Sequence, residues 1–213
     1  NYLLTYGIAA ACVSVSVPLV YISSTGVYGE AQDSPYREYA EPRPTTNHHR
    51  AKLLGEQAVL SASTRNLVLR IGWLFGGAFD NPKNFIARRI EEAINAARHG
   101  HTLFSNSEQR GCPTFTKDVA ERILLLIKER RSGIYNVVNE GNASRQEYVS
   151  AIVEAAGLTV HVESASAASF NRRAKVSSNE MAVNWRAQET GLPAMPSWRD
   201  SLRWYIRQQL PIT

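Results

Sequence analysis

The sequence predicts an α/β protein with a parallel β-sheet and helices packed against it. Two nearly continuous apolar stretches, 17–24 and 67–76, are typical of buried parallel strands. Helical patterns lie between and after them, and strands that alternate with helices indicate right-handed crossovers. The chain has 213 residues, enough for one good-sized domain with its own core.

The remaining elements follow from hydrophobic periodicity and from helix boundary residues. Helices are predicted at 1–14, 47–62, 84–100, 114–133, 144–157 and 196–210, and a third strand at 134–139. Ser144 and Glu147 form a capping-box pattern, and Thr116 is the predicted N-cap of its helix. From residue 77 onward helices dominate, which predicts a smaller region joined to the sheet.

Composition excludes several classes of function. The net charge is +5, but the basic residues are scattered apart from one cluster at 128–131, so no nucleic-acid partner is expected. No apolar run approaches the roughly 18–20 residues of a membrane span. Cys12 and Cys112 lie far apart and the histidines have no ordered spacing, so neither a disulfide nor a metal site is expected. A reducing, cytoplasmic setting is the expectation.

Three polar clusters are predicted at strand ends, where open α/β sheets bind their ligands. They are "SSTGVYG" (23–29), "NHHRAKLLGE" (47–56) and "RIGWLFGG" (70–77). In the second cluster, a spacing of four residues places His48 and Lys52 on one helix face.

These clusters, in this order, resemble the extended short-chain dehydrogenase/reductase superfamily. "SSTGVYG" resembles its serine-bearing active-site segment, and "NHHRAKLLGE" its Tyr-Gly-x-x-Lys-Leu-x-Gly-Glu helix. The segments "NFIARRI", "QRGCPTFTKDVAERI", "GIYNVVNEGNASRQEYVSAIVEAAGL" and "PSWRDSLRWYI" narrow the resemblance to the dTDP-4-dehydrorhamnose reductase family. The similarity is collinear and covers nearly the whole chain.

The resemblance implies a Rossmann-like doubly wound parallel sheet, incomplete at its N-terminal side, with a small C-terminal substrate-binding region. Residues 1–76 would form the C-terminal half of the dinucleotide-binding domain. Residues 77–213 would carry substrate-binding segments and a strand, 134–139, that returns to the main sheet. The implied reaction is reduction of the 4-keto group of a nucleotide-linked deoxysugar by NADP or NAD. The implied partners are that nucleotide sugar and a second copy in a homodimer.

The resemblance also assigns roles to individual residues. Ser24 would hold the substrate carbonyl, Lys52 would bind the cofactor ribose and lower the pKa of the acid, and His48 stands where the family has its catalytic tyrosine. The cofactor contacts are expected at Ser23, Lys52, Ile71, Gly72 and Trp73. The sugar nucleotide contacts are expected at Thr25, Tyr28, Asn84, Gln109, Arg110 and Thr114. Asn84 is alternatively a helix cap, and Arg110 a solvated loop residue.

His48 is the departure from the family pattern, and it leaves alternatives open. An imidazolium can donate a proton at neutral pH, but Lys52 and an oxidised nicotinamide disfavour a charged histidine, and an imidazole reaches less far than a phenol. If His48 is not the acid, the site has lost or relocated its chemistry, or a phenol of Tyr28, Tyr36 or Tyr39 supplies the proton. His49, His99 and His101 are expected at the surface.

Two other functions compete with the reductase. The first is a pseudoenzyme that binds partners. The family includes a noncatalytic branch, the regulatory beta subunit of methionine adenosyltransferase, which "PYRE" (35–38) and "QR-x-x-PT" (109–114) resemble. The second is an epimerase or dehydratase, which ranks last because "SSTG" offers no acidic pair beside the serine.

The glycine-rich turn that binds the cofactor pyrophosphate in this family is not in the sequence. No Gly-x-x-Gly-x-x-Gly pattern occurs, and Asn1 corresponds to a point roughly 80–90 residues into a typical member, on the scale of domain sizes. Either the chain is a piece of a longer protein, or the protein lacks its cofactor half. We expect the first, because the strand at 17–24 would otherwise be an exposed apolar sheet edge.

Overall fold

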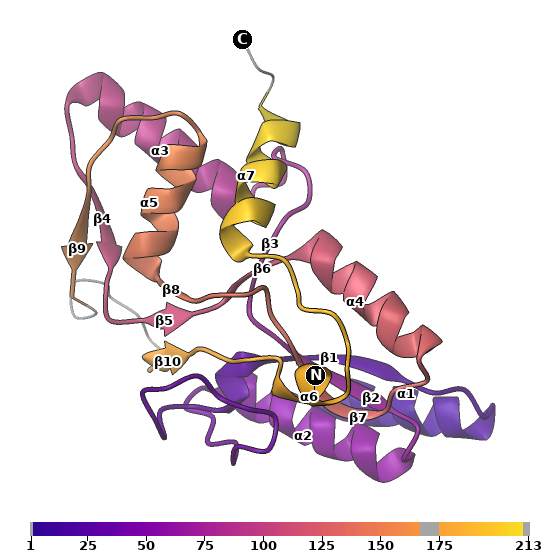
Figure 1. The fold of residues 1–213 in the computed structure, drawn as a ribbon. Coiled ribbons are helices and arrows are strands. Elements are labelled where there is room, and N and C mark those ends of the chain that lie inside the picture. The colour runs from indigo at the N-terminus through magenta and orange to yellow at the C-terminus, as the bar shows by residue number, and fades with distance from the viewer. Residues whose placement is uncertain (1, 167–174, 211–213) are drawn as a thin grey trace.

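A three-stranded parallel sheet forms the base of the structure, a computed structural model that describes residues 2–166 and 175–210. Its strands are β1 (Val20–Ser24), β2 (Leu67–Ile71) and β7 (Gly133–Val137), in the order β1-β2-β7. Figure 1 shows them side by side in the lower half of the molecule. The predicted parallel α/β fold is confirmed, and the predicted third strand pairs with the second.

Helices cover both faces of this sheet. On one face, apolar side chains of α1 and α2 pack against Val68 of β2, and on the other, side chains of α4 and α6 pack against Leu69. These helices are α1 (Tyr2–Ser14), α2 (Asn47–Ala62), α4 (Thr116–Lys128) and α6 (Trp185–Glu189). Strands that are buried on both faces have nearly continuous apolar sequences, and for this reason β1 and β2 could be predicted.

The strand predicted at 67–76 is in fact two strands in different sheets, so this prediction is wrong. After β2 the chain turns at Gly72 and continues as β3 (Trp73–Phe75), which pairs with β6 (Pro113–Phe115). A side chain at Gly72 would collide with the carbonyl oxygen of Cys112. Glycine therefore lets the chain leave the main sheet without a break in its apolar pattern.

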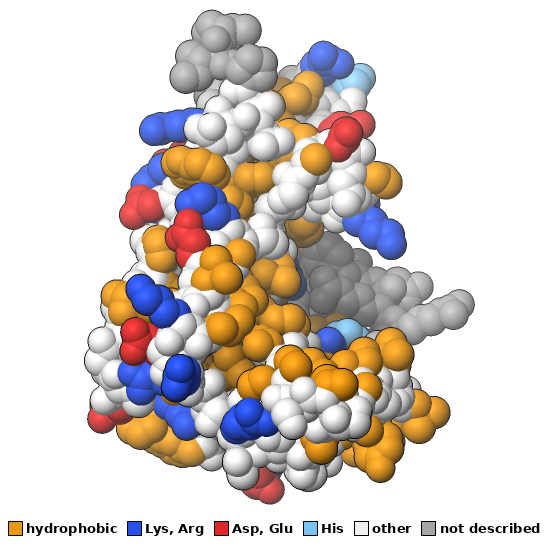
Figure 2. Space-filling model, turned by 90° about the vertical axis from the view of Figure 1, so that its right-hand side faces the viewer, with side chains coloured by type: hydrophobic (Ala, Val, Ile, Leu, Met, Phe, Trp, Pro, Cys, Tyr) orange, Lys and Arg blue, Asp and Glu red, His pale blue; other side chains and the backbone are white. Residues whose placement is uncertain are grey.

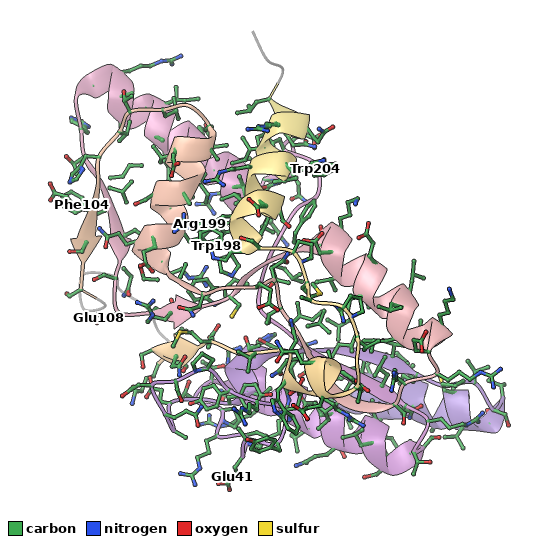
Figure 3. All side chains as sticks on the ribbon, in the orientation of Figure 1. Glu41, Phe104, Glu108, Trp198, Arg199 and Trp204 are labelled. Carbon is green, nitrogen blue, oxygen red and sulfur yellow. The ribbon has the colours of Figure 1, made fainter. Side chains whose placement is uncertain are left out.

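The upper half of the molecule is a helical region with short strands. Its core gathers aromatic side chains from three helices, including Tyr148, Tyr205 and Trp198, and Figure 3 shows Trp198 on α7. The helices are α3 (Phe85–His99), α5 (Arg145–Ala155) and α7 (Trp198–Gln209). Five short strands, none of them predicted, are β4 (Leu103–Asn106), β5 (Arg110–Gly111), β8 (Ala143–Ser144), β9 (Val162–Ala165) and β10 (Asn179–Glu180).

The helix boundaries test the predicted caps. Ser144 and Glu147 form the predicted capping box at the start of α5, and Asn84 caps α3 by accepting from the Ala87 N–H at 3.1 Å. The predicted cap at Thr116 is wrong, because Thr116 is already the first residue of α4. Phe115, the last residue of β6, precedes it without a side-chain cap, because a phenyl ring has no oxygen to accept a hydrogen bond.

Helix α1 is apolar on all sides, and much of it is exposed. Leu3 is 81% and Leu4 70% exposed, and Ile22 lies on the neighbouring β1, an edge strand of its sheet. Figure 2 shows hydrophobic side chains gathered in the lower part of the molecule on the side that carries α1 and α4. No helix in the described ranges has both the length and the apolar character to cross a membrane. Contiguous exposed apolar surface is uncommon on monomeric soluble proteins.

Candidate active site

Ser24 stands at the carboxyl end of β1, where the sequence places the carbonyl-binding hydroxyl. Its Oγ accepts a hydrogen bond from the Gly26 N–H at 3.2 Å and so caps the short 3-10 helix η1 (Thr25–Val27). That bond uses the oxygen as acceptor, so the hydroxyl hydrogen can be donated. In the sheet register, Ser24 lies opposite Ile71, a predicted cofactor contact. The structure therefore brings these two predicted site residues together.

Lys52 lies beside the same strand end. Its Nζ donates to the carbonyl oxygen of Ile22 at 2.8 Å and lies 5.1 Å from the centroid of the Tyr21 ring. Burial lowers the pKa of Lys52, and the nearby Glu56 carboxylate opposes this shift. The Lys52 ammonium is thus bound to the backbone of β1 at Ile22, two residues before Ser24.

The two histidines at the start of α2 have different surroundings. His48 is exposed, and its ring lies 5.2 Å from that of His49. The prediction that His49 is a surface residue is wrong: it is buried, and its ring occupies the space where a side chain on Gly26 would lie. Burial, with a smaller contribution from His48, lowers the pKa of His49 from 6.5 to about 4. His49 is therefore neutral at neutral pH.

The three tyrosines considered as alternative acids lie elsewhere. Tyr28 is fully buried, stacks on Tyr36 at 4.7 Å between ring centroids, and donates its hydroxyl to Asn136 at 2.7 Å. Burial raises the pKa of Tyr28 to about 12. Tyr39 is exposed and packs edge-on against Trp185. Tyr28 and Tyr36 are thus core residues here, and Tyr28 does not present its hydroxyl to the surface.

Trp73 begins β3, just beyond the carboxyl end of β2. Its indole N–H donates to Glu180 at 2.6 Å, and the guanidinium of Arg145 lies 3.5 Å from its ring centroid. Gly111 lies directly against the ring, where a side chain would collide with it. Neither Glu180 nor Arg145 was predicted at this site, because both lie far from Trp73 along the chain.

The predicted sugar-nucleotide contacts differ in exposure. Thr25, Tyr28, Asn84, Gln109 and Thr114 are all buried. Thr114 donates to the Cys112 carbonyl at 2.9 Å, and the Asn84 amide donates to Tyr205 at 2.7 Å. Arg110 keeps 43% of its side chain exposed and lies 3.7 Å from Glu147. Among the six, Arg110 is the one whose side chain reaches the surface.

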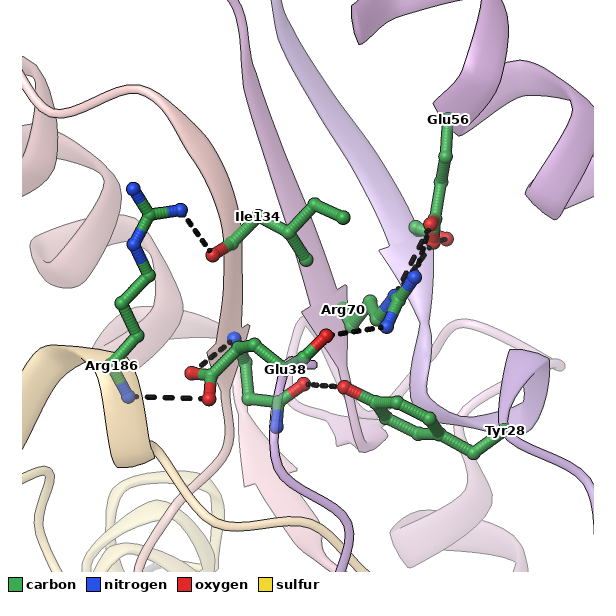
Figure 4. A network of polar contacts seen from close by, with 8 residues as sticks. Tyr28, Glu38, Glu56, Arg70, Ile134 and Arg186 are labelled. Carbon is green, nitrogen blue, oxygen red and sulfur yellow. Dashed lines mark hydrogen bonds and ion pairs between the residues drawn. The ribbon is translucent and has the colours of Figure 1, made fainter. Parts of the chain in front are cut away.

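A buried polar network lies beneath Ser24 and Lys52. Glu56 and Arg70 form an ion pair at 2.7 Å, and Ser23 donates its hydroxyl to Glu56. Figure 4 shows the network continuing from Arg70 towards Glu38 and Tyr28. Ser23, predicted to contact the cofactor, is thus engaged with Glu56 in the interior. Glu56 falls in the helix motif matched in the sequence, but its partners are not local to it.

The fold, with a serine and a lysine at the end of one parallel strand, is that of extended short-chain reductases. The chain belongs to the family described as RmlD substrate binding domain, whose match spans residues 1–210. It is 33% identical over 203 residues to a dTDP-4-dehydrorhamnose reductase of Mycobacterium tuberculosis, covering 92% of this chain and 64% of that protein.

Solved structures agree with this membership. A dTDP-4-dehydrorhamnose reductase from Clostridium acetobutylicum matches with a TM-score of 0.86 and 27% identity, over 96% of this chain and 70% of that one. The enzyme from Bacillus anthracis, solved in complex with NADP, matches with a TM-score of 0.86 and 26% identity, again over 96% and 70%. The chain thus spans about two thirds of the length of these relatives.

Proposed function

We propose that this chain forms the catalytic and sugar-binding part of an NAD(P)-dependent reductase that acts on the 4-keto group of a nucleotide-linked deoxysugar. The observation that carries the proposal is the position of Lys52, whose ammonium lies against the strand end that carries Ser24. The reductase relatives, one of them solved with NADP, support this reading.

Each residue has a distinct task in such a reaction. A ketone that receives a hydride becomes an alkoxide, so the site needs a hydrogen-bond donor, a cation and a proton source. The Ser24 hydroxyl is free to donate to the carbonyl oxygen, and the Lys52 ammonium supplies the positive charge. His48 occupies the position of the acid and, being exposed, can exchange protons with solvent.

The residues present fit one end of a nicotinamide cofactor, which would supply the hydride when bound. Lys52, Ile71 and Trp73 lie at or just beyond the carboxyl ends of β1 and β2, where the nicotinamide and its ribose would lie. The pyrophosphate end has no glycine-rich turn among the 213 residues.

Replacement of Lys52 by alanine tests the proposal in the full-length protein. With NADPH or NADH and a dTDP-linked 4-keto-6-deoxysugar, we expect turnover to fall about 100- to 10,000-fold, the usual size of a lost proton-transfer system. Lys117→Ala is the matched control, because Lys117 is an exposed lysine that forms an ion pair with Glu121 on its own helix. Wild-type turnover in Lys52→Ala contradicts the proposal.

A second candidate function is a noncatalytic, partner-binding role on the same fold. Two observations favour it: a histidine stands in the acid's position, and α1 exposes an apolar surface. His48→Tyr separates the two functions. For a working reductase we expect the substitution to lower turnover, because the proton source has been replaced. A large gain in reductase activity would instead identify a degenerate natural site.

A further inference from the structure

The Glu56–Arg70 ion pair is the most deeply buried ion pair in residues 2–166 and 175–210. Each side chain is 2% exposed, and the two are joined by hydrogen bonds of 2.7 to 3.2 Å from Arg70 Nε and Nη2. Burying two charges is costly, and apolar residues of similar volume often stabilise a core equally well. Stability alone therefore does not explain this pair, and the segments that it joins indicate a positioning role.

The pair holds together four separate parts of the chain. Glu56 lies on α2, and Arg70 lies on β2. Ser23, at the end of β1, donates to Glu56 Oε1. Arg70 Nη1 donates to the Glu38 carbonyl in the loop before α2 at 3.3 Å, and its guanidinium covers the Tyr28 ring at 4.7 Å. Figure 4 shows the bonds from Arg70 to Glu56 and to the Glu38 carbonyl.

This network contains close sequence neighbours of both proposed catalytic groups. Glu56 comes one helical turn after Lys52, so both project from the same face of α2. Ser23 comes directly before Ser24, and adjacent strand residues project to opposite faces. The hydroxyl of Ser23 thus anchors the strand end to α2 from the interior, while Ser24 projects on the other side.

We propose that Ser23 and Glu56 are positioning residues that set the distance between Ser24 and Lys52, with Arg70 holding the Glu56 carboxylate in place. The inference rests on the proposed reductase function for its kinetic consequence, but the geometry it describes exists without turnover. Reacting groups misplaced by about 1 Å can lose about 100-fold in rate. Loss of a hydrogen bond that fixes the spacing of Ser24 and Lys52 is therefore expected to lower kcat more than it weakens substrate binding.

Ser23→Ala in the full-length protein tests the kinetic part. We expect kcat to fall about 10- to 100-fold while KM for the cofactor and for the keto sugar stays within about twofold. Ser23→Thr keeps the hydroxyl and is expected to restore kcat. Ser61→Ala, an exposed serine on the same helix, is the matched control. An unchanged kcat, or a rise in KM alone, overturns the inference.

Amide hydrogen exchange tests the positioning without any activity. In Ser23→Ala, we expect the Gly26, Tyr28 and His49 amides to exchange about fivefold faster, as for one lost hydrogen bond, while the Glu147 amide of α5 is unchanged. Unchanged exchange at the first three overturns the inference. A wild-type protein that reduces no keto sugar overturns the proposed function instead, and the exchange result still decides the positioning role.

Discussion

The two regions where the predicted site residues gather are built in opposite ways. Beneath Ser24 and Lys52, the contacts are ionic and hydrogen bonded, with Glu56 and Arg70 at their centre. Trp73 bonds Glu180 and lies under Arg145, but the core that it joins is apolar and rich in aromatic side chains. One region depends on the identity of individual polar atoms, and the other on buried area and shape.

The difference has a consequence for tolerance to change. Removing one member of a buried ion pair leaves the other charge without a partner in a low-dielectric interior. An aromatic cluster can absorb a conservative substitution with a moderate loss, because packing and transfer terms scale with the volume removed. We therefore expect the serine–lysine end of the sheet to be the more easily disrupted part of the site.

The largest expected effect on stability comes from the ion pair. Arg70→Ala leaves the Glu56 carboxylate unpaired, so we expect the free energy of unfolding to fall by about 3–5 kcal/mol, measured by chemical denaturation. Arg203→Ala is the matched control, because its pair with Asp200 is exposed and is expected to contribute only about 0–1 kcal/mol. Equal losses in the two variants would contradict the contrast between the regions.

A smaller effect is expected from the titration of His49. Its pKa in the folded protein is lowered from 6.5 to about 4, so the unfolded chain binds the proton more tightly. The contribution of neutral, buried His49 to the free energy of unfolding is therefore fully present above about pH 6.5 and is lost as the pH falls towards 4. His49→Gln should flatten the unfolding free energy measured across this range, and an unaltered pH dependence would show that another group is responsible.

Much of the fold was predictable because its signals are local. The apolar runs of β1 and β2 and the capping box of Ser144 and Glu147 lie within single segments, and all of them are present in the structure. The break at Gly72 was not predictable. Gly72 lies against the carbonyl oxygen of Cys112, which is 40 residues further along the chain, and the apolar pattern of 67–76 continues across it.

The candidate site was predictable to a similar degree. The ordered motifs predicted Ser24, Lys52 and His48 as site residues, and the structure brings Ser24 and Lys52 to one strand end. The motifs did not reveal that His49 fills the space above Gly26, or that Glu180 and Arg145 flank Trp73. These contacts join residues that are distant in sequence and follow no period.

The fold class, the family and the residue types at the strand ends follow from the amino-acid sequence, because periodicity, capping and motif order are properties of short segments. Which of those residues face outward and which lie in the interior depends on long-range packing. Ser23 and Ser24 show this most clearly. They are adjacent and identical in chemistry. The pleat of β1 and the buried position of Glu56 nevertheless tie the Ser23 hydroxyl into the interior, whereas the Ser24 hydroxyl only accepts a bond from the Gly26 N–H.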